Sequence, residues 1–439
     1  MTRHPRRLLV LLSLRLFLAP AGAKDGVSPI KSDLFPPERW HNHGSCILQI
    51  PNRQLLVVWF HGSGERKADD VRIEGARRIR GRWTPRMTVA DTPGYPDTNP
   101  SLFLDARQRL WLVYPTILAN LWESALLKVH VSSSYSGKGV PVWDHHDVLH
   151  VTPGPEFDRE VTATLPLLAA SANEPPWTES TRREVKEYLD ALHLNTTNRL
   201  YRRLGWMTRA HPQVLRSGRI LMPLYHDGFS ASLVARSDDH GVTWTTSNPL
   251  IGGGNIQPSI VMGRSGQLVA FMRDNGPPPK RLLQATSLDH GATWGPVTDS
   301  PIPNPGSGAE VIRLHDNSWL FVGNDTEDGR HRLSLWLSTD DGATWRSRRI
   351  LEDSAGDSFS YPSIIQAHDG RIHVTYSVAT KAGETIRHAE FPVAWMTDAP
   401  PSCGALPMAG ASPRGNLVSN GERATTRDAK RAAALRVAP

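Results

Sequence analysis

The chain has 439 residues, 39% of them hydrophobic, and 50 Lys and Arg residues against 43 Asp and Glu residues, for a formal net charge of +7. This length and hydrophobic content are sufficient for a substantial buried core. The basic residues are dispersed and match no nucleic-acid-binding module, so we expect no nucleic-acid partner; an acidic carbohydrate fits the charge equally well.

The N-terminus has the features of a secretory signal. Three arginines within the first seven residues precede an apolar run, Leu8–Leu18, and a small-residue cleavage site, Ala21-Gly22-Ala23, follows it. We therefore expect residues 1–23 to be a signal peptide and the protein to be secreted or periplasmic. The apolar run is too short to span a bilayer, which predicts no stable membrane insertion.

The two cysteines, Cys46 and Cys403, are too few for a disulfide scaffold. Export would permit one bridge between them. We favour a buried Cys46 in a strand and an incidental Cys403, although the sequence leaves their pairing open.

Six pairs of β-rich runs follow one another between residues 40 and 395. The first run of each pair often carries a proline near its start, where the missing amide need not join a strand ladder. These first runs are Ser45–Leu48, Asn99–Phe103, His211–Leu215, Gln257–Val261, Ala309–Ile312 and Tyr361–Ile365.

An insertion of about residues 158–208 interrupts this rhythm between the second and third pairs. Thr181 and Glu184 have the spacing of a capping box, which predicts a helix start at Thr181. Apolar residues then recur at helical spacing: Val185, Tyr188, Leu189 and Leu192. We expect this stripe to be used in packing.

An eight-residue phrase, Ser-x-Asp-x-Gly-x-Thr-Trp, occurs three times, with starts 50 and 51 residues apart: Ser237–Trp244, Ser287–Trp294 and Ser338–Trp345. A fixed period of this length indicates stacked or radially arranged units. Asp bonds to nearby backbone amides and Gly supplies a positive φ, so the phrase predicts a turn between two strands, which the Trp anchors. The absence of any periodicity in residues 396–439 predicts a disordered tail.

The phrase resembles the Asp box, or BNR repeat, of sialidases (neuraminidases). The resemblance covers residues 40–395 and implies an all-β fold, a six-bladed β-propeller with a short helical insertion between blades two and three. In that family the boxes lie on the outer rim, so we expect a structural role for their aspartates. The resemblance implies an exo-glycosidase that uses no cofactor or metal.

The resemblance also implies site residues at the centre of the propeller. Tyr361, directly before the last inner strand, matches the family's nucleophile, a phenol that a substrate carboxylate does not repel. Arg273 and Arg330 match two of the three arginines that bind this carboxylate, with Arg332 as a rival to Arg330. A packed aromatic and two solvated arginines remain the alternatives.

A loop of the first blade, in which Arg66 precedes Asp69 and Asp70, resembles the loop that carries the acid/base carboxylate in sialidases. Inspection does not separate the two aspartates, and a solvated turn is the alternative. The cluster Asp144-His145-His146-Asp147 is the single metal-like run, and we expect a loop there, because adjacent histidines of an extended chain point to opposite sides.

Two positions depart from the family pattern. His43 stands where the first arginine is expected, and Asn255 lies near the place of the glutamate that supports the nucleophile. Glu310 is a candidate substitute for that glutamate, and Arg209, with His211, could compensate for the arginine. Because Asn cannot accept a proton from Tyr, sialic acid itself is in question as substrate.

The leading hypothesis is an exported, monomeric, sialidase-like exo-glycosidase that removes a terminal acidic sugar from glycans with retention. A non-catalytic carbohydrate-binding propeller and a polysaccharide lyase on a similar propeller are the alternatives. The sequence does not identify the sugar or its linkage.

Overall fold

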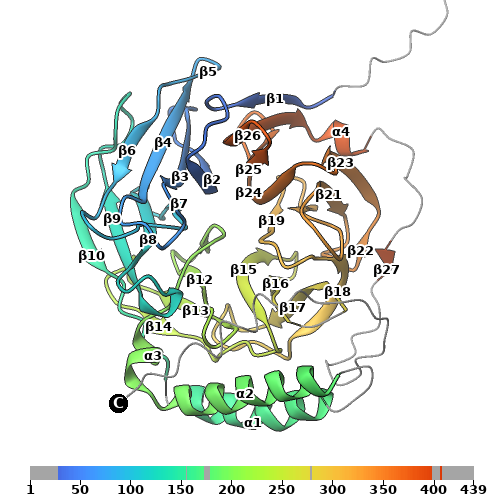
Figure 1. Cartoon of the computed structure of the whole chain (residues 1–439). Helices are drawn as coiled ribbons and strands as arrows, with labels where there is room; N and C mark the ends of the chain where they lie inside the picture. The colour runs from blue at the N-terminus through green and yellow to red at the C-terminus, as the bar shows by residue number, and fades with distance from the viewer. Residues whose placement is uncertain (1–27, 155, 173–177, 277–278, 398–405, 408–439) are drawn as a thin grey trace, which may run out of the picture.

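The computed structural model describes residues 28–154, 156–172, 178–276, 279–397 and 406–407. Six antiparallel sheets stand radially around a central axis (Figure 1). The predicted all-β, six-bladed propeller is confirmed.

The blades follow one another along the chain, and each runs from an inner strand at the axis to an outer strand at the rim. Blade one contains β2 (His41–Gln49), β3 (Leu55–Gly62), β4 (Arg72–Ile79), β5 (Arg82–Trp83) and β6 (Met87–Ala90). Blade two contains β7 (Ser101–Leu104), β8 (Leu110–Ile117), β9 (Ala125–Ser132) and β10 (His145–Val148). Blade three contains β11 (Gln213–Val214), β12 (Ile220–His226), β13 (Ala231–Ser237) and β14 (Thr245–Thr246). The fourth and fifth contain β15 (Asn255–Met262), β16 (Leu268–Asp274), β17 (Arg281–Ser287) and β18 (Thr298–Pro303); and β19 (Glu310–Arg313), β20 (Trp319–Gly323), β21 (Arg332–Ser338) and β23 (Ser347–Asp353).

The sixth blade closes the ring with both ends of the propeller. Its inner strands are β24 (Ser358–Gln366), β25 (Arg371–Thr380) and β26 (Gly383–Pro392), and its outer strand is the N-terminal β1 (Ile30–Asp33). The propeller therefore begins about ten residues before the boundary expected at residue 40, because β1 supplies the last strand of the last blade.

The core lies between neighbouring blades. A middle strand is covered on both faces by the adjacent sheets, so β3 is buried at all eight positions and β8 likewise. This arrangement explains why the apolar runs of the sequence are continuous and do not alternate. The largest fully buried side chains include Trp59 and Trp319.

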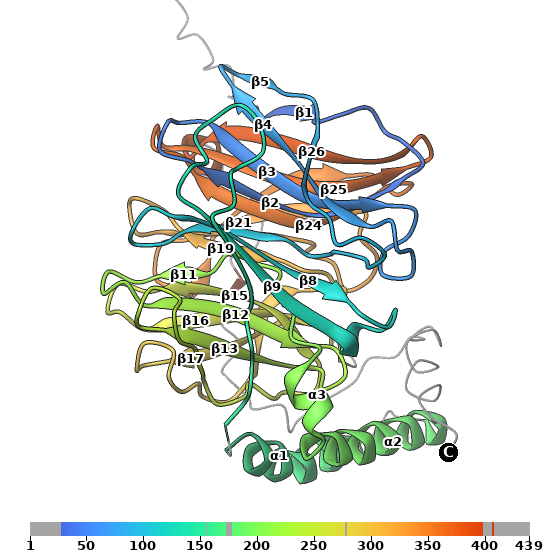
Figure 2. The ribbon, with the colours of Figure 1, turned by 90° about the vertical axis from the view of Figure 1, so that its left-hand side faces the viewer.

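The predicted helical insertion contains α1 (Glu156–Ala172), α2 (Glu179–Thr196) and α3 (Arg199–Arg203). Figures 1 and 2 show α1 and α2 across the outer edge of the propeller, beside blades three and four. Tyr188 Oη donates to the Phe229 carbonyl at 3.0 Å, which confirms that this residue packs against the blades. The predicted capping box is wrong, because α2 begins at Glu179 and Thr181 lies inside it.

Each repeated phrase forms the turn after the third strand of its blade. In the second copy, Asp289 accepts hydrogen bonds from Ser287 Oγ, the Thr293 amide and Thr293 Oγ1. Gly291 follows with φ +82°. The box aspartates are thus occupied by their own turns, on the rim and away from the axis.

Two predictions concern segments at the edges of the fold. His145–Val148 form β10, so the loop expected at residues 144–147 is wrong from His145 onward. Within the predicted disordered tail, β27 (Leu406–Pro407) pairs with β22 (Thr344–Trp345), and α4 spans Ala394–Thr397. The expected signal peptide and Cys403 lie outside the described residues.

Candidate functional site

Four inner strands have a residue in the left-handed backbone conformation at or near their start. These residues are Gly44, Asn99, Gln257 and Tyr361, with φ of +63°, +41°, +55° and +53°. At three of these places the pairing with the next strand shifts its register, which is the signature of a β-bulge. A bulge redirects a side chain away from the regular alternation of a strand, and here it directs residues of different blades toward one another at the axis.

Tyr361 is the centre of this convergence. Its hydroxyl accepts hydrogen bonds from Arg273 Nη1 at 2.9 Å and from Gln257 Nε2 at 3.1 Å. The Arg330 guanidinium lies over the phenol ring, 5.4 Å from its centroid, and the His43 ring lies 4.3 Å away between centroids. The structure thus brings together Tyr361, Arg273, Arg330 and His43 from blades six, four, five and one.

Gln257, and not Asn255, is the residue beside the phenol. The Asn255 side chain is fully buried and donates to the Leu250 carbonyl at 2.8 Å. Gln257 lies between Tyr361 and a second phenol, with its Nε2 3.4 Å from Tyr225 Oη. Sequence reasoning missed it, although it is the residue before the proline in the fourth opening, as Tyr361 is in the sixth. An amide does not accept a proton from a phenol. The question of whether sialic acid is the substrate, first raised by Asn255, is therefore raised by Gln257 instead.

Arg209 does not lie in the ring of groups around the phenol hydroxyl. Its guanidinium lies beneath the Tyr361 ring, 5.0 Å from the centroid, and donates to the backbone carbonyls of Ser45, Tyr361 and Pro362. Its contacts are therefore those of a structural group, in place of the substrate contact expected from the sequence.

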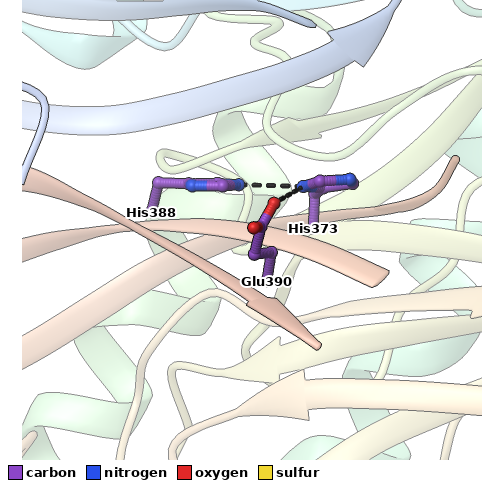
Figure 3. A group of neighbouring side chains, drawn as sticks. All are labelled: His373, His388 and Glu390. Atoms are coloured by element: carbon purple, nitrogen blue, oxygen red, sulfur yellow. Dashed lines mark hydrogen bonds and ion pairs between the residues drawn. The ribbon is translucent and has the colours of Figure 1, made fainter. Parts of the chain in front are cut away.

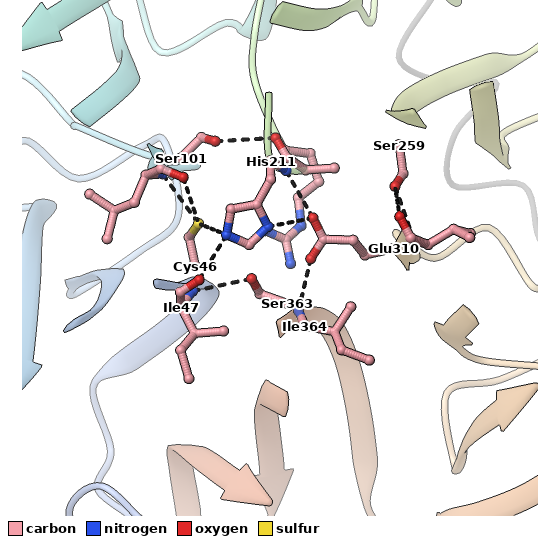
Figure 4. Close-up of polar contacts among 12 residues, drawn as sticks. Cys46, Ile47, Ser101, His211, Ser259, Glu310, Ser363 and Ile364 are labelled. Carbon is pink, nitrogen blue, oxygen red and sulfur yellow. Dashed lines mark hydrogen bonds and ion pairs between the residues drawn. The ribbon is translucent and has the colours of Figure 1, made fainter. Parts of the chain in front are cut away.

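Glu310 also differs from its expected role beside the nucleophile. Its Oε1 accepts from the backbone amide and Nδ1 of His211, and its Oε2 from the Ile364 amide (Figure 4). On the far side of the imidazole, His211 Nε2 lies 2.7 Å from the Ile47 carbonyl and 3.3 Å from Cys46 Sγ. Glu310 is thus part of a buried network that joins blades one, three, five and six.

The first-blade loop presents a different carboxylate from the two predicted. Asp70 accepts hydrogen bonds from the Ser63 amide and Oγ, within its own loop, and Asp69 is exposed. Arg66 extends to the second blade, where Nε donates to the Asn120 carbonyl. Glu65 of the same loop is exposed, and its charge acts on Arg330 and on His41, so Glu65 is a further candidate carboxylate.

The charges around the phenol decide the state of the nearby imidazoles. Burial, with His41 and the three surrounding arginines, holds the pKa of His43 well below its ordinary value, so His43 is neutral at pH 7. Although burial opposes it, the hydrogen bond and charge of Glu384 raise the pKa of His41. Burial also lowers the pKa of Arg330, against the charges of Tyr361 and Glu65, but a guanidinium stays protonated. His43 therefore does not supply the positive charge of the arginine that it replaces.

A second cluster of titratable groups lies on blade six, under the ring-closing strand. His373 Nδ1 is 3.0 Å from His388 Nε2 and 3.6 Å from Glu390 Oε2 (Figure 3). The two rings are nearly coplanar, at 13°, and the carboxylate already pairs with Arg78. Two imidazoles at this distance form an N–H···N hydrogen bond, and Arg78 offsets the carboxylate charge that would attract a cation. The three side chains are thus accounted for by hydrogen bonds and ion pairs within the protein.

An apolar hollow of about 560 Å³ lies elsewhere, between β9 and α3. Leu127, Val151, Leu204 and Trp206 are among its lining residues. Its lining is mainly apolar, although His150, Arg199 and Arg203 also border it. We place the candidate site at Tyr361, where polar groups from several blades converge on one hydroxyl. Among the described helices, none has both the length and the apolar composition that a membrane span requires.

Comparisons with known proteins show what this chain is similar to. Residues 157–374 match the model of a BNR repeat-like domain. A sialidase from Micromonospora viridifaciens is 30% identical over 170 residues, which cover 36% of this chain and 25% of the relative. A xyloglucanase from a Paenibacillus species is 32% identical over 172 residues, 33% of this chain and 15% of the relative. The chain thus spans a quarter or less of these curated relatives.

Among solved structures, the intramolecular trans-sialidase from Ruminococcus gnavus superposes with a TM-score of 0.61 at 11% identity, covering 84% of this chain and 99% of that one. At this identity the likeness shows the fold. The chain is a sialidase-like propeller with BNR repeats. In this sialidase-like propeller Tyr361 lies at the axis with Arg273 and Arg330, and the neutral His43 and Gln257 lie beside it.

Proposed function

We propose that this sialidase-like propeller is an exo-glycosidase that hydrolyses a terminal acidic sugar from glycans with retention of configuration. One observation carries the proposal: Tyr361 Oη lies 2.9 Å from Arg273 Nη1, with the Arg330 guanidinium over the same ring. Two guanidinium groups beside one phenol form a site that binds a carboxylate and presents an uncharged nucleophile to the adjacent carbon.

The charges assign a role to each group. Arg273 and Arg330 bind the sugar carboxylate, because a planar guanidinium donates two parallel hydrogen bonds to it. Tyr361 attacks the anomeric carbon, where a carboxylate nucleophile would be repelled by the substrate's own charge. Its hydroxyl proton passes to solvent water, because the Gln257 amide cannot accept it. Glu65, an exposed loop carboxylate whose charge acts on Arg330, protonates the leaving oxygen and then activates water. This assigns to Glu65 the role first expected of Asp69 or Asp70.

Gln257 supports a second candidate, a carbohydrate-binding propeller without turnover. The phenol has hydrogen-bond donors from Arg273 and Gln257 and no carboxylate partner among its contacts in the described residues. A site of this kind would hold an acidic sugar through its arginines and leave the glycosidic bond intact.

The test is a panel of fluorogenic glycosides of acidic sugars, assayed with the wild type and with Tyr361→Phe. We expect turnover of one of these glycosides and a loss of at least about 10²-fold in kcat in the variant. Tyr135→Phe is the matched control, because this phenol donates to the Gln108 carbonyl in a loop away from the axis. Turnover of the wild-type level in Tyr361→Phe contradicts the mechanism, and glycan binding without turnover favours the second candidate.

We also propose that the protein is exported and that residues 1–23 are removed. The proposal is supported by the arginines, the apolar run and the small residues before Lys24. Mass spectrometry of the protein from its native host should give an N-terminus at Lys24, and an intact Met1 on the mature protein would contradict it.

A further inference from the structure

Tyr361 adopts a backbone conformation that its residue type disfavours. Its φ is +53°, in the left-handed region, where the Cβ of a non-glycine residue crowds the following carbonyl. The next residue is Pro362, which restricts the conformations of the residue before it. A residue so placed persists when its surroundings hold it there.

The contacts that hold it come from blade three. Arg209 Nη2 donates to the Tyr361 carbonyl at 2.5 Å and to the Pro362 carbonyl at 3.1 Å, while Nη1 donates to the Ser45 carbonyl at 3.2 Å. The same guanidinium lies under the Tyr361 ring. One side chain, 3% exposed, therefore binds both carbonyls of the bulge and the face of its aromatic ring.

Thr208, the residue before Arg209, makes an equivalent contact with another left-handed residue. Its Oγ1 donates to the Asn99 carbonyl at 2.9 Å. The segment Thr208-Arg209 thus holds the strand openings of blades one, two and six, while its own blade has no left-handed residue at the corresponding place.

The buried guanidinium is balanced by Glu310. The Glu310 charge acts on Arg209, and its carboxylate binds His211, two residues further along the same segment, and the Ile364 amide (Figure 4). A buried charge is tolerated where hydrogen bonds and an opposite charge compensate its loss of water. Glu310 therefore joins the Arg209 segment to β24, the strand that contains Tyr361.

We propose that Arg209 is a positioning residue that holds Tyr361 in its left-handed bulge and thereby directs the phenol toward Arg273. This inference rests on the proposed function for its catalytic consequence. The role of Arg209 in holding the Tyr361 backbone does not depend on that function and can be tested without a substrate.

The substrate-free test compares Tyr361→Gly with Tyr361→Ala by thermal unfolding, in the wild-type background and in Arg209→Met. Glycine accepts φ +53° without strain, so with Arg209 present we expect the glycine variant to unfold about 2 °C above the alanine variant. With Arg209→Met the bulge is free to relax, and we expect this difference to vanish. Arg219→Met, in the same blade and on the rim beside Asp238, should leave the difference unchanged.

The catalytic test separates kcat from KM. Arg209→Met should lower kcat about 10²-fold with KM within about twofold, because Arg273 and Arg330 still bind the carboxylate. Arg209→Lys keeps the charge but lacks the planar guanidinium fork that reaches the three carbonyls, and it should not restore kcat. Glu310→Gln gives a second, milder variant if Arg209→Met does not fold, and it should also reduce the glycine–alanine difference.

The outcomes distinguish the two proposals. If the wild type turns over no acidic glycoside, the proposed function fails, while a vanishing glycine–alanine difference still supports the role of Arg209. If that difference is unchanged in both Arg209→Met and Glu310→Gln, or if a crystal structure of Arg209→Met keeps φ of residue 361 positive, the positioning role is overturned.

Discussion

At the residue scale, Gln257 separates this site from a complete sialidase-like site. Its amide is 3.1 Å from the Tyr361 hydroxyl and can donate to the phenol but cannot take its proton. A carboxylate at this place would act as the general base during attack by the phenol.

We therefore predict that Gln257→Glu raises kcat on an acidic glycoside by about 10²-fold, the range of one general base. The pH–rate profile should gain an acidic limb from the new carboxyl group. Gln257→Met, which removes the polar group, is the control and should not show the increase. A Gln257→Glu variant that folds but is no faster than the wild type would contradict a phenol nucleophile.

A second residue-scale prediction concerns His211. Although burial opposes it, the charges of Cys46 and Glu310 and the hydrogen bonds to them raise the pKa of His211 well above 6.5. A pKa raised by folding contributes stability that is complete below the unfolded value and is lost as pH rises through the folded value. The Tm advantage of the wild type over His211→Asn should thus be largest near pH 6 and shrink above neutral pH. Differential scanning fluorimetry between pH 5 and 10 measures it, and an advantage that grows with pH would be the contrary result.

At the element scale, the repeated turn and the β-bulge of the inner strands are separate features at different places in a blade. The turn lies on the rim, where Asp289 binds Ser287 and Thr293 and leaves no contact toward the axis. The bulges lie at the axis, where Gln257 of one inner strand contacts Tyr361 of another. The prominent motif therefore supports the blade, and the residue before the proline serves the site.

The turns should make the fold sensitive to acid. Although burial opposes it, hydrogen bonds from Thr293 and Ser287 lower the pKa of Asp289 from 3.8 to about 2. A lowered pKa contributes stability above the unfolded value that is lost as pH falls through the folded one, here between about 4 and 2. Asp289→Ala should destabilise the protein by about 1 kcal/mol at pH 7, as the loss of a capping side chain does, and the penalty should fade toward pH 2.

The control for this prediction is Asp190→Ala, which removes an exposed ion pair with Lys186 on α2 and should change stability little. Chemical unfolding at pH 7 and at pH 3 measures both variants. A penalty for Asp289→Ala that is the same at both pH values would contradict the assignment.

At the scale of the whole molecule, the ring depends on a strand that lies outside the repeats. β1 pairs with β26 over four residue pairs, and its Lys31 and Asp33 make ion pairs with Glu352 and Arg387. Because a propeller is stable when its first and last blades are joined, these contacts hold the two ends of the described fold together.

We predict that a chain beginning at Leu34 unfolds at least about 5 °C below one beginning at Val27, since it loses several backbone hydrogen bonds and two ion pairs. A chain beginning at Val27 retains β1 and is the matched control. Thermal unfolding followed by circular dichroism measures the difference, and equal midpoints would show that β1 does not close the ring.

The sequence by itself determined the repeat, the blade count and the openings of the inner strands. These features could be read because local turn chemistry repeats with a fixed period and because middle strands buried on both faces appear as continuous apolar runs. Tyr361, Arg273 and Arg330 were also identified from the sequence, since each has a defined place relative to the inner strands.

Only the tertiary structure decided which groups face the phenol. A bulge changes the side on which each side chain emerges, so Gln257 and not Asn255 reaches Tyr361. Asp70 bonds to Ser63 of its own loop, whereas the charge of Glu65 acts on Arg330. Arg209 and Glu310 took structural roles because their partners are backbone groups of other blades, and contacts over such sequence separations depend on how the six blades close around one axis.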